Sequence, residues 1–88
     1  MTVHAVPVVD RLERDGRTLL LLERRVVELS PLGLAAYDAV SEPLTVPELT
    51  EVLVGLFGSP PEGDASEGVQ RLVDELGSLG LLTAEGLG

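Results

Sequence analysis

The stretch Val26-Val27-Glu28-Leu29-Ser30-Pro31-Leu32 decides the fold, because a strand pattern ends and a helix pattern begins within it. Val26–Leu29 contains two β-branched residues, which favour short strands. Ser30 is a preferred helix N-cap, and Pro31 at the first helical position loses no N–H that the helix needs. The chain before this stretch therefore predicts strands, and the chain after it predicts helices.

Two further strands are expected upstream. The first alternates loosely and is rich in valine, as pleated strands are. Asp15-Gly16 is a strong hairpin signal, and Arg24-Arg25 can make a second tight turn. The three expected strands are Val3–Leu12, Thr18–Glu23 and Val26–Leu29.

Three capped helices are expected downstream. Thr45 and Glu48 form a capping-box pattern, Asp64 begins the third helix, and Gly80 is placed to end it. The first helix is predicted over Pro31–Val40. The residues expected to point inward are Leu32, Ala35, Ala36, Ala39 and Val40, then Leu49, Val52, Leu53, Leu56 and Phe57, then Val69, Leu72, Val73, Leu76 and Leu79.

This order of elements predicts an α+β, winged-helix-like fold, with a three-stranded antiparallel sheet followed by three helices. Eighty-eight residues make a single domain, residues 1–88, with a core over about residues 5–82. Residues 83–88 are expected to be a frayed tail.

Charge is distributed unevenly along the chain. Residues 1–29 carry five arginines and five carboxylates, whereas residues 30–88 carry ten carboxylates and one arginine. The helical half therefore repels phosphate, which disfavours nucleic acid as a partner.

Cysteine is absent, so disulfides and thiolate metal sites are excluded, and a reducing cytoplasm is a compatible location. The longest purely apolar run, Leu19–Leu22, is far too short to span a bilayer, so no membrane is expected as a partner.

No motif for catalysis or cofactor binding stands out. The single histidine, His4, has none of its usual metal-site companions, and we expect it to play a plain surface role. The glycines match neither the nucleotide fingerprint nor the P-loop. We therefore expect no enzyme, no metal and no cofactor.

The borders of the predicted sheet suggest binding instead. Pro7 would blunt the first strand, whereas the third strand has no proline and is protected only by flanking charges. An open edge can accept an extended peptide, although it can also be an ordinary short edge strand. One face of Leu19–Leu22 would be exposed unless a second copy, a docked enzyme or the N-terminal segment covers it.

The sequence resembles a known family. The segments that carry the resemblance follow the order Gly16-Arg17-Thr18-Leu19-Leu20-Leu21, Arg25–Gly33, Leu44-Thr45-Val46-Pro47-Glu48-Leu49, Val69–Leu76 and Leu79-Gly80-Leu81-Leu82. They resemble PqqD-like proteins, the stand-alone leader-binding domains called RiPP recognition elements, over roughly residues 5–82. RiPPs are ribosomally made and post-translationally modified peptides.

The resemblance implies a binding mode. Family members bind the leader of a precursor peptide as an antiparallel strand on the third strand, in a cleft walled by the third helix. Carried onto this sequence, the backbone contacts fall on Arg25, Val26, Val27, Glu28 and Leu29. Val27→Pro is expected to abolish binding by removing a ladder N–H. The cleft wall falls on Val69, Gln70, Arg71, Leu72, Val73 and Leu76. Arg25 and Arg71 could pair with leader carboxylates.

The resemblance also implies a role. The chain is expected to be a non-catalytic, cytoplasmic adaptor that presents a precursor peptide to modifying enzymes. A lasso-type pathway with a protease and a ring-closing cyclase is favoured, and a radical enzyme is the nearest alternative partner. A winged-helix DNA regulator, a subunit that forms a homodimer through Leu19–Leu22, and a small enzyme are the rival hypotheses.

Overall fold

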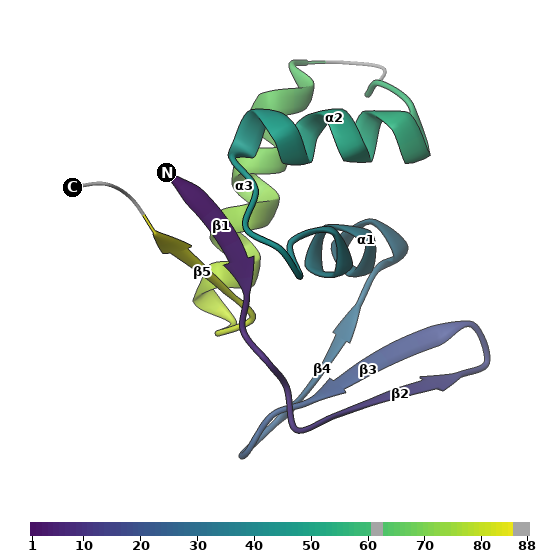
Figure 1. Cartoon of the computed structure of the whole chain (residues 1–88). Coiled ribbons are helices and arrows are strands. Elements are labelled where there is room, and N and C mark those ends of the chain that lie inside the picture. Colours follow the sequence, from purple (N-terminus) through teal and green to yellow (C-terminus); the bar gives the residue numbers. More distant parts are fainter. Residues whose placement is uncertain (61–62, 86–88) are drawn as a thin grey trace.

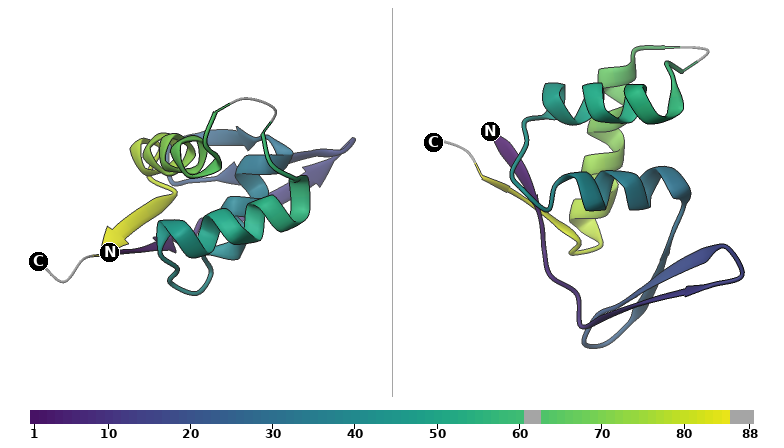
Figure 2. Two further views of the ribbon diagram at one scale, coloured as in Figure 1. Left: turned by 90° about the horizontal axis from the view of Figure 1, so that it is seen from above. Right: turned by 45° about the vertical axis from the view of Figure 1, so that its right-hand side comes forward.

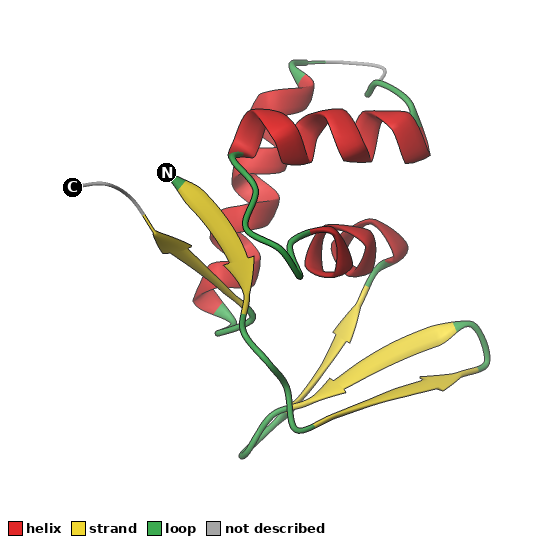
Figure 3. Ribbon diagram, in the orientation of Figure 1, coloured by secondary structure: helices red, strands yellow, loops and turns green. Residues whose placement is uncertain are grey.

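The computed structural model describes residues 1–60 and 63–85, and it confirms the predicted α+β class. Figures 1 and 3 show a three-stranded antiparallel sheet on one side of three helices, together with a separate pair of short strands. This arrangement is consistent with a winged-helix-like domain. The elements are β1 (Thr2–Ala5), β2 (Asp10–Arg14), β3 (Arg17–Leu21), β4 (Val26–Leu29), α1 (Pro31–Ala39), α2 (Val46–Phe57), α3 (Ala65–Ser78) and β5 (Leu82–Glu85).

The sheet β2-β3-β4 is built by the two turns that the sequence predicts. Asp15 and Gly16 both have positive φ, 54° and 75°, which is the backbone of the hairpin turn that suits twisted strands. The second turn is closed by a hydrogen bond of 2.8 Å from the Leu22 N–H to the Arg25 carbonyl. The third predicted strand coincides with β4.

The first predicted strand, Val3–Leu12, is wrong as a single element. It divides into β1 and β2, which belong to different sheets. Pro7 lies in the link between them and has no N–H to continue a ladder. The Val6 N–H instead bonds to the Leu81 carbonyl at 2.8 Å, so the chain leaves the plane of the larger sheet there.

The predicted frayed tail is also wrong where the structure describes it. Thr83–Glu85 belong to β5, which pairs antiparallel with β1, from Ala5↔Leu82 to Thr2↔Glu85. Val3 is fully buried and Leu82 is nearly so, and therefore the core begins before residue 5. Residues 86–88 of that tail lie outside the described residues.

An aliphatic core lies between the inner face of the larger sheet and the three helices. Several residues expected to point inward do not, because each helix buries only a narrow stripe. On α1, Ala36 and the following Val40 are buried but Leu32 is exposed; on α2, only Leu49 and Leu53 are buried. The exposed residues of the predicted α2 stripe are Val52, Leu56 and Phe57.

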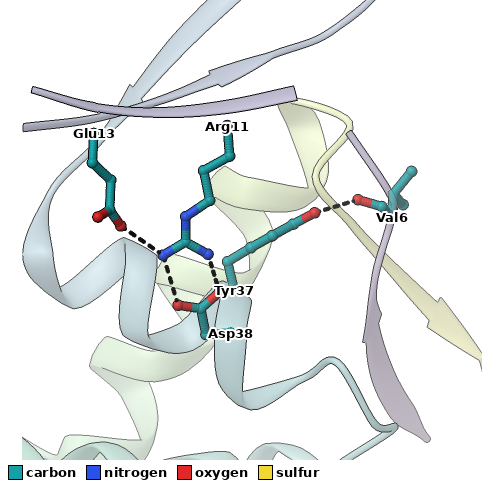
Figure 4. Close-up of polar contacts among 5 residues, drawn as sticks. All are labelled: Val6, Arg11, Glu13, Tyr37 and Asp38. Carbon is teal, nitrogen blue, oxygen red and sulfur yellow. Dashed lines mark hydrogen bonds and ion pairs between the residues drawn. The ribbon is translucent and has the colours of Figure 1, made fainter. Parts of the chain in front are cut away.

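Polar side chains of α1 hold β2 and the link between β1 and β2 against the helices (Figure 4). Arg11 of β2 binds Asp38 in a two-pronged ion pair, with N···O distances of 2.8 and 3.2 Å, and also reaches Glu13 at 3.2 Å. The Tyr37 hydroxyl donates a 2.7 Å hydrogen bond to the carbonyl of Val6, in the link after β1. Partial burial raises the pKa of Tyr37, so this donor keeps its proton at neutral pH.

Tyr37→Phe is therefore expected to destabilise the protein by about 1 kcal/mol, because the Val6 carbonyl loses its donor. For a domain of this size, that loss lowers the midpoint of thermal unfolding by about 4–8 °C. Thermal unfolding followed by circular dichroism measures it. An unchanged midpoint would show that the hydroxyl does not hold the link in place.

Candidate functional site

The edge of β4 is open in the structure. The strand order is β2-β3-β4, so β4 pairs with β3 on one side and with no described strand on the other. β4 contains no proline, and its four residues are the only ones between the preceding turn and Ser30. A short row of backbone donors and acceptors is therefore available for a further strand.

The register of the ladder identifies which backbone groups face outward. Leu22 and Arg25 form a hydrogen-bonded pair that closes the turn, and such pairs alternate along an antiparallel ladder. Val27 and Leu29 are then bonded to β3, whereas Val26 and Glu28 turn their N–H and C=O groups to the open side. The resemblance implies the N–H of Val27 as a peptide contact, but this N–H is turned toward β3. The available groups belong to its two neighbours, Val26 and Glu28.

A charge pair beside the edge lies on the outer face of the sheet. Arg17 of β3 binds Glu28 with its Nε donating at 3.0 Å to one carboxylate oxygen and its Nη2 donating to the other. The hydrogen bonds from the Arg17 guanidinium lower the pKa of Glu28. Since the pair engages only side chains, the backbone of Glu28 remains open.

The C-terminal half of α3 lies on the open side of β4, across from β3 (Figures 1 and 2). Gly80, with φ of 81°, ends the helix as predicted, and the Leu81 N–H bonds back to the Leu76 carbonyl at 3.0 Å. Arg25, immediately before β4, donates from Nη2 to the Leu79 carbonyl. This bond joins the start of the open edge to the end of α3. It occupies part of the arginine side chain that the resemblance pairs with a leader carboxylate.

Two faces of α3 have different neighbours. Asp74 and Gly77 line a shallow pocket with Val3 and Leu82 of the small sheet. Leu72 lies on another face of the helix and lines an apolar pocket of about 300 Å³. That pocket is bounded by the start of α1, the end of α2 and the first half of α3, and its lining includes Leu32, Leu53, Phe57, Gly68, Val69 and Leu72.

The predicted wall residues of α3 therefore separate into different environments. Val69, Val73 and Leu76 are buried in the core, although Val69 also borders the pocket. Arg71 is exposed, and Leu72 is half-buried at the pocket. Gln70 is half-buried and donates a 3.0 Å hydrogen bond to Asp74. On β4, Leu29 is buried, Val27 is half-buried, and Arg25, Val26 and Glu28 are exposed.

Sequence reasoning missed two apolar residues of this region. Leu32 and Phe57 line the pocket and keep 42% and 51% of their surface exposed. Both fit the helical period of buried residues, so the sequence pattern places them in the core. The available signal was their position: each lies at the end of its helix, where a side chain can pass beyond the core.

The single histidine contacts the backbone of a loop. The His4 Nε2 donates to the Ser41 carbonyl at 3.2 Å and so links β1 to the loop after α1. Within residues 1–60 and 63–85, no cluster of three or more histidine or carboxylate side chains is arranged to hold a metal ion. No helix in the same ranges is long and apolar enough to cross a membrane.

Comparisons of the chain with models of protein families, with curated proteins and with solved structures found no match.

Proposed function

We propose that this protein is a non-catalytic, peptide-binding adaptor that takes the leader segment of a ribosomally made precursor peptide as a fourth strand on β4. One observation carries the proposal: the edge of β4 is unpaired and free of proline, and its outward N–H and C=O groups face the side on which α3 lies. Strand addition of this kind draws affinity from backbone hydrogen bonds and selectivity from pockets beside the edge.

The direction of the bound peptide follows from the ladder. An antiparallel partner of β4 runs from the α1 end of the strand toward the turn at Arg24-Arg25. Its N-terminal part then lies nearer the helical pocket at Leu32 and Leu72, and its C-terminal part lies nearer Arg25. The leader is therefore expected to carry a large apolar residue on the N-terminal side of its paired segment.

Charge disfavours DNA as the ligand of this site. The exposed residues of α3 include Glu67, Asp74 and Glu75 against Arg71 alone. A recognition helix with this balance repels phosphate, whereas a neutral or basic peptide meets no such penalty.

The adaptor would act in the cytoplasm and present the precursor to its modifying enzymes. A lasso-type pathway, with a leader-cleaving protease and a ring-closing cyclase, is the favoured setting, and a radical enzyme is the alternative partner. Genes next to that of this protein test the setting directly: a short precursor gene beside a peptidase or cyclase gene supports it.

The binding itself is tested by titrating a fluorescently labelled leader, made from the precursor encoded by such a neighbouring gene. We expect saturable binding with a Kd between about 1 µM and tens of nanomolar, or about −8 to −10 kcal/mol. The contact is a short strand on a small surface, so protease-inhibitor affinity is not expected. No saturation below about 100 µM would contradict the proposal.

A further inference from the structure

The outer face of the sheet β2-β3-β4 is uncovered and apolar. All three helices lie on the other side of this sheet, and no described element crosses the outer side (Figures 1 and 2). Leu12 and Val26 are 49% and 59% exposed, and Leu19 and Leu21 are half-buried but are not packed against the core. We call these four residues the outer patch.

The strand register places the outer patch in one contiguous group. Leu12 lies opposite Leu19 across the β2–β3 ladder, and Leu21 lies opposite Val26 across the β3–β4 ladder. Leu19 and Leu21 are two residues apart on β3, so they lie on one face. The N-terminal segment of the chain does not cover this face, because β1 pairs with β5 elsewhere.

Charges at the two ends of the outer face are of opposite sign. Asp10 shares a row with Leu21, whereas Arg14 and Arg17 form the row beside the hairpin turn. Arg17 is paired with Glu28, but Arg14 has no ion-pair partner among the described residues. A two-fold axis along the Leu12–Leu19 row places Asp10 of each copy opposite Arg14 of the other, and Leu21 opposite Arg17. Glu28 lies in the axial row and meets its own counterpart, with its charge compensated by Arg17 of the same copy.

We propose that the outer patch is the interface of a symmetric dimer, in which the larger sheets of two copies pack face to face. Two such sheets pack about 10 Å apart, with Leu12 and Leu19 meeting their own counterparts across the axis. Charge favours a second copy at this face. Residues 1–29 have no net charge, whereas residues 30–88 carry the whole excess of −9, so only the sheet half can meet itself without strong repulsion.

The area of the outer face sets the expected affinity of the dimer. Three strands of about five residues cover roughly 250 Å² in projection, from a rise of about 3.3 Å and a spacing of about 4.8 Å. This is smaller than a standard interface, so the dimer is expected to be weak, with a Kd of roughly 10–100 µM. Val26 contributes its side chain to the interface, whereas its backbone N–H and C=O groups point along the plane of the sheet toward the open edge of β4.

Sedimentation equilibrium of the full chain from about 5 µM to about 500 µM tests the proposal without any peptide. The expected average mass rises from 9.3 kDa toward twice that value. Leu12→Asp is expected to raise the dimer Kd at least about tenfold. Leu56→Asp is the matched control, because Leu56 is 65% exposed but lies on α2, and it should leave the Kd unchanged.

Charge reversal gives a second readout that does not depend on the apolar residues. Asp10→Arg and Arg14→Asp are each expected to raise the Kd about fivefold, and the double variant to restore it. A chain that keeps the monomer mass at the highest concentration would overturn the proposal, as would a dimer that survives Leu12→Asp or a double variant weaker than either single one. Failure here leaves leader binding at β4 untouched.

Discussion

Glu28→Pro is expected to weaken leader binding by at least about 100-fold, or about 3 kcal/mol. Proline removes the N–H that Glu28 offers to the open side of β4, and its ring fills the space where the added strand would lie. The fold should persist, because the ladder to β3 uses Val27 and Leu29 rather than Glu28. Titration of the labelled leader measures the loss.

Glu28→Gln is the matched control for this substitution. It keeps the backbone N–H and removes only the carboxylate that binds Arg17, so its Kd should stay within about threefold of that of the natural chain. Val27→Pro should instead destabilise the protein, since it removes a bond between β3 and β4. Normal binding by a folded Glu28→Pro variant would mean that the leader does not pair with this edge.

Removal of β5 is the second change with a large expected effect. A chain ending at Leu81 should lose about 3 kcal/mol or more of unfolding free energy, because it gives up the burial of Leu82 and leaves buried Val3 without its strand partner. A domain of 88 residues has a total of roughly 4–13 kcal/mol, so a large part of the chain should unfold. Chemical denaturation followed by circular dichroism measures the loss.

The matched truncation ends at Glu85 and retains all of β5. Its unfolding free energy should equal that of the full chain within about 0.5 kcal/mol. If the chain ending at Leu81 were as stable as the full chain, the β1–β5 pair would contribute nothing to the unfolding free energy. That result would fit a frayed tail.

The local signals in the sequence predict the two turns of the larger sheet and the residues at which the three helices begin. Asp15-Gly16 dictates a turn through its backbone preference, and the caps at Ser30, Thr45 and Asp64 begin the three helices where the pattern places them. These signals are short-range, so they act without knowledge of the rest of the chain.

Long-range pairing could not be predicted in the same way. β1 finds its partner near the other end of the chain, and neither Thr2–Ala5 nor Leu82–Glu85 carries a turn signal that joins them. The same limit applies at the site, because the hydrophobic period of a helix does not show how wide a stripe its neighbours cover. Leu32 and Phe57 therefore fit the core pattern but line an open pocket.

Backbone amide exchange, followed by NMR in the free protein and in the complex with leader, tests the central claim most directly. In the free protein, the amides of Val27 and Leu29 should already be protected by β3, whereas those of Val26 and Glu28 should exchange with solvent. Saturation with leader should slow Val26 and Glu28 by at least about tenfold. Exchange of these two amides at the free rate in the saturated complex would contradict strand addition on β4.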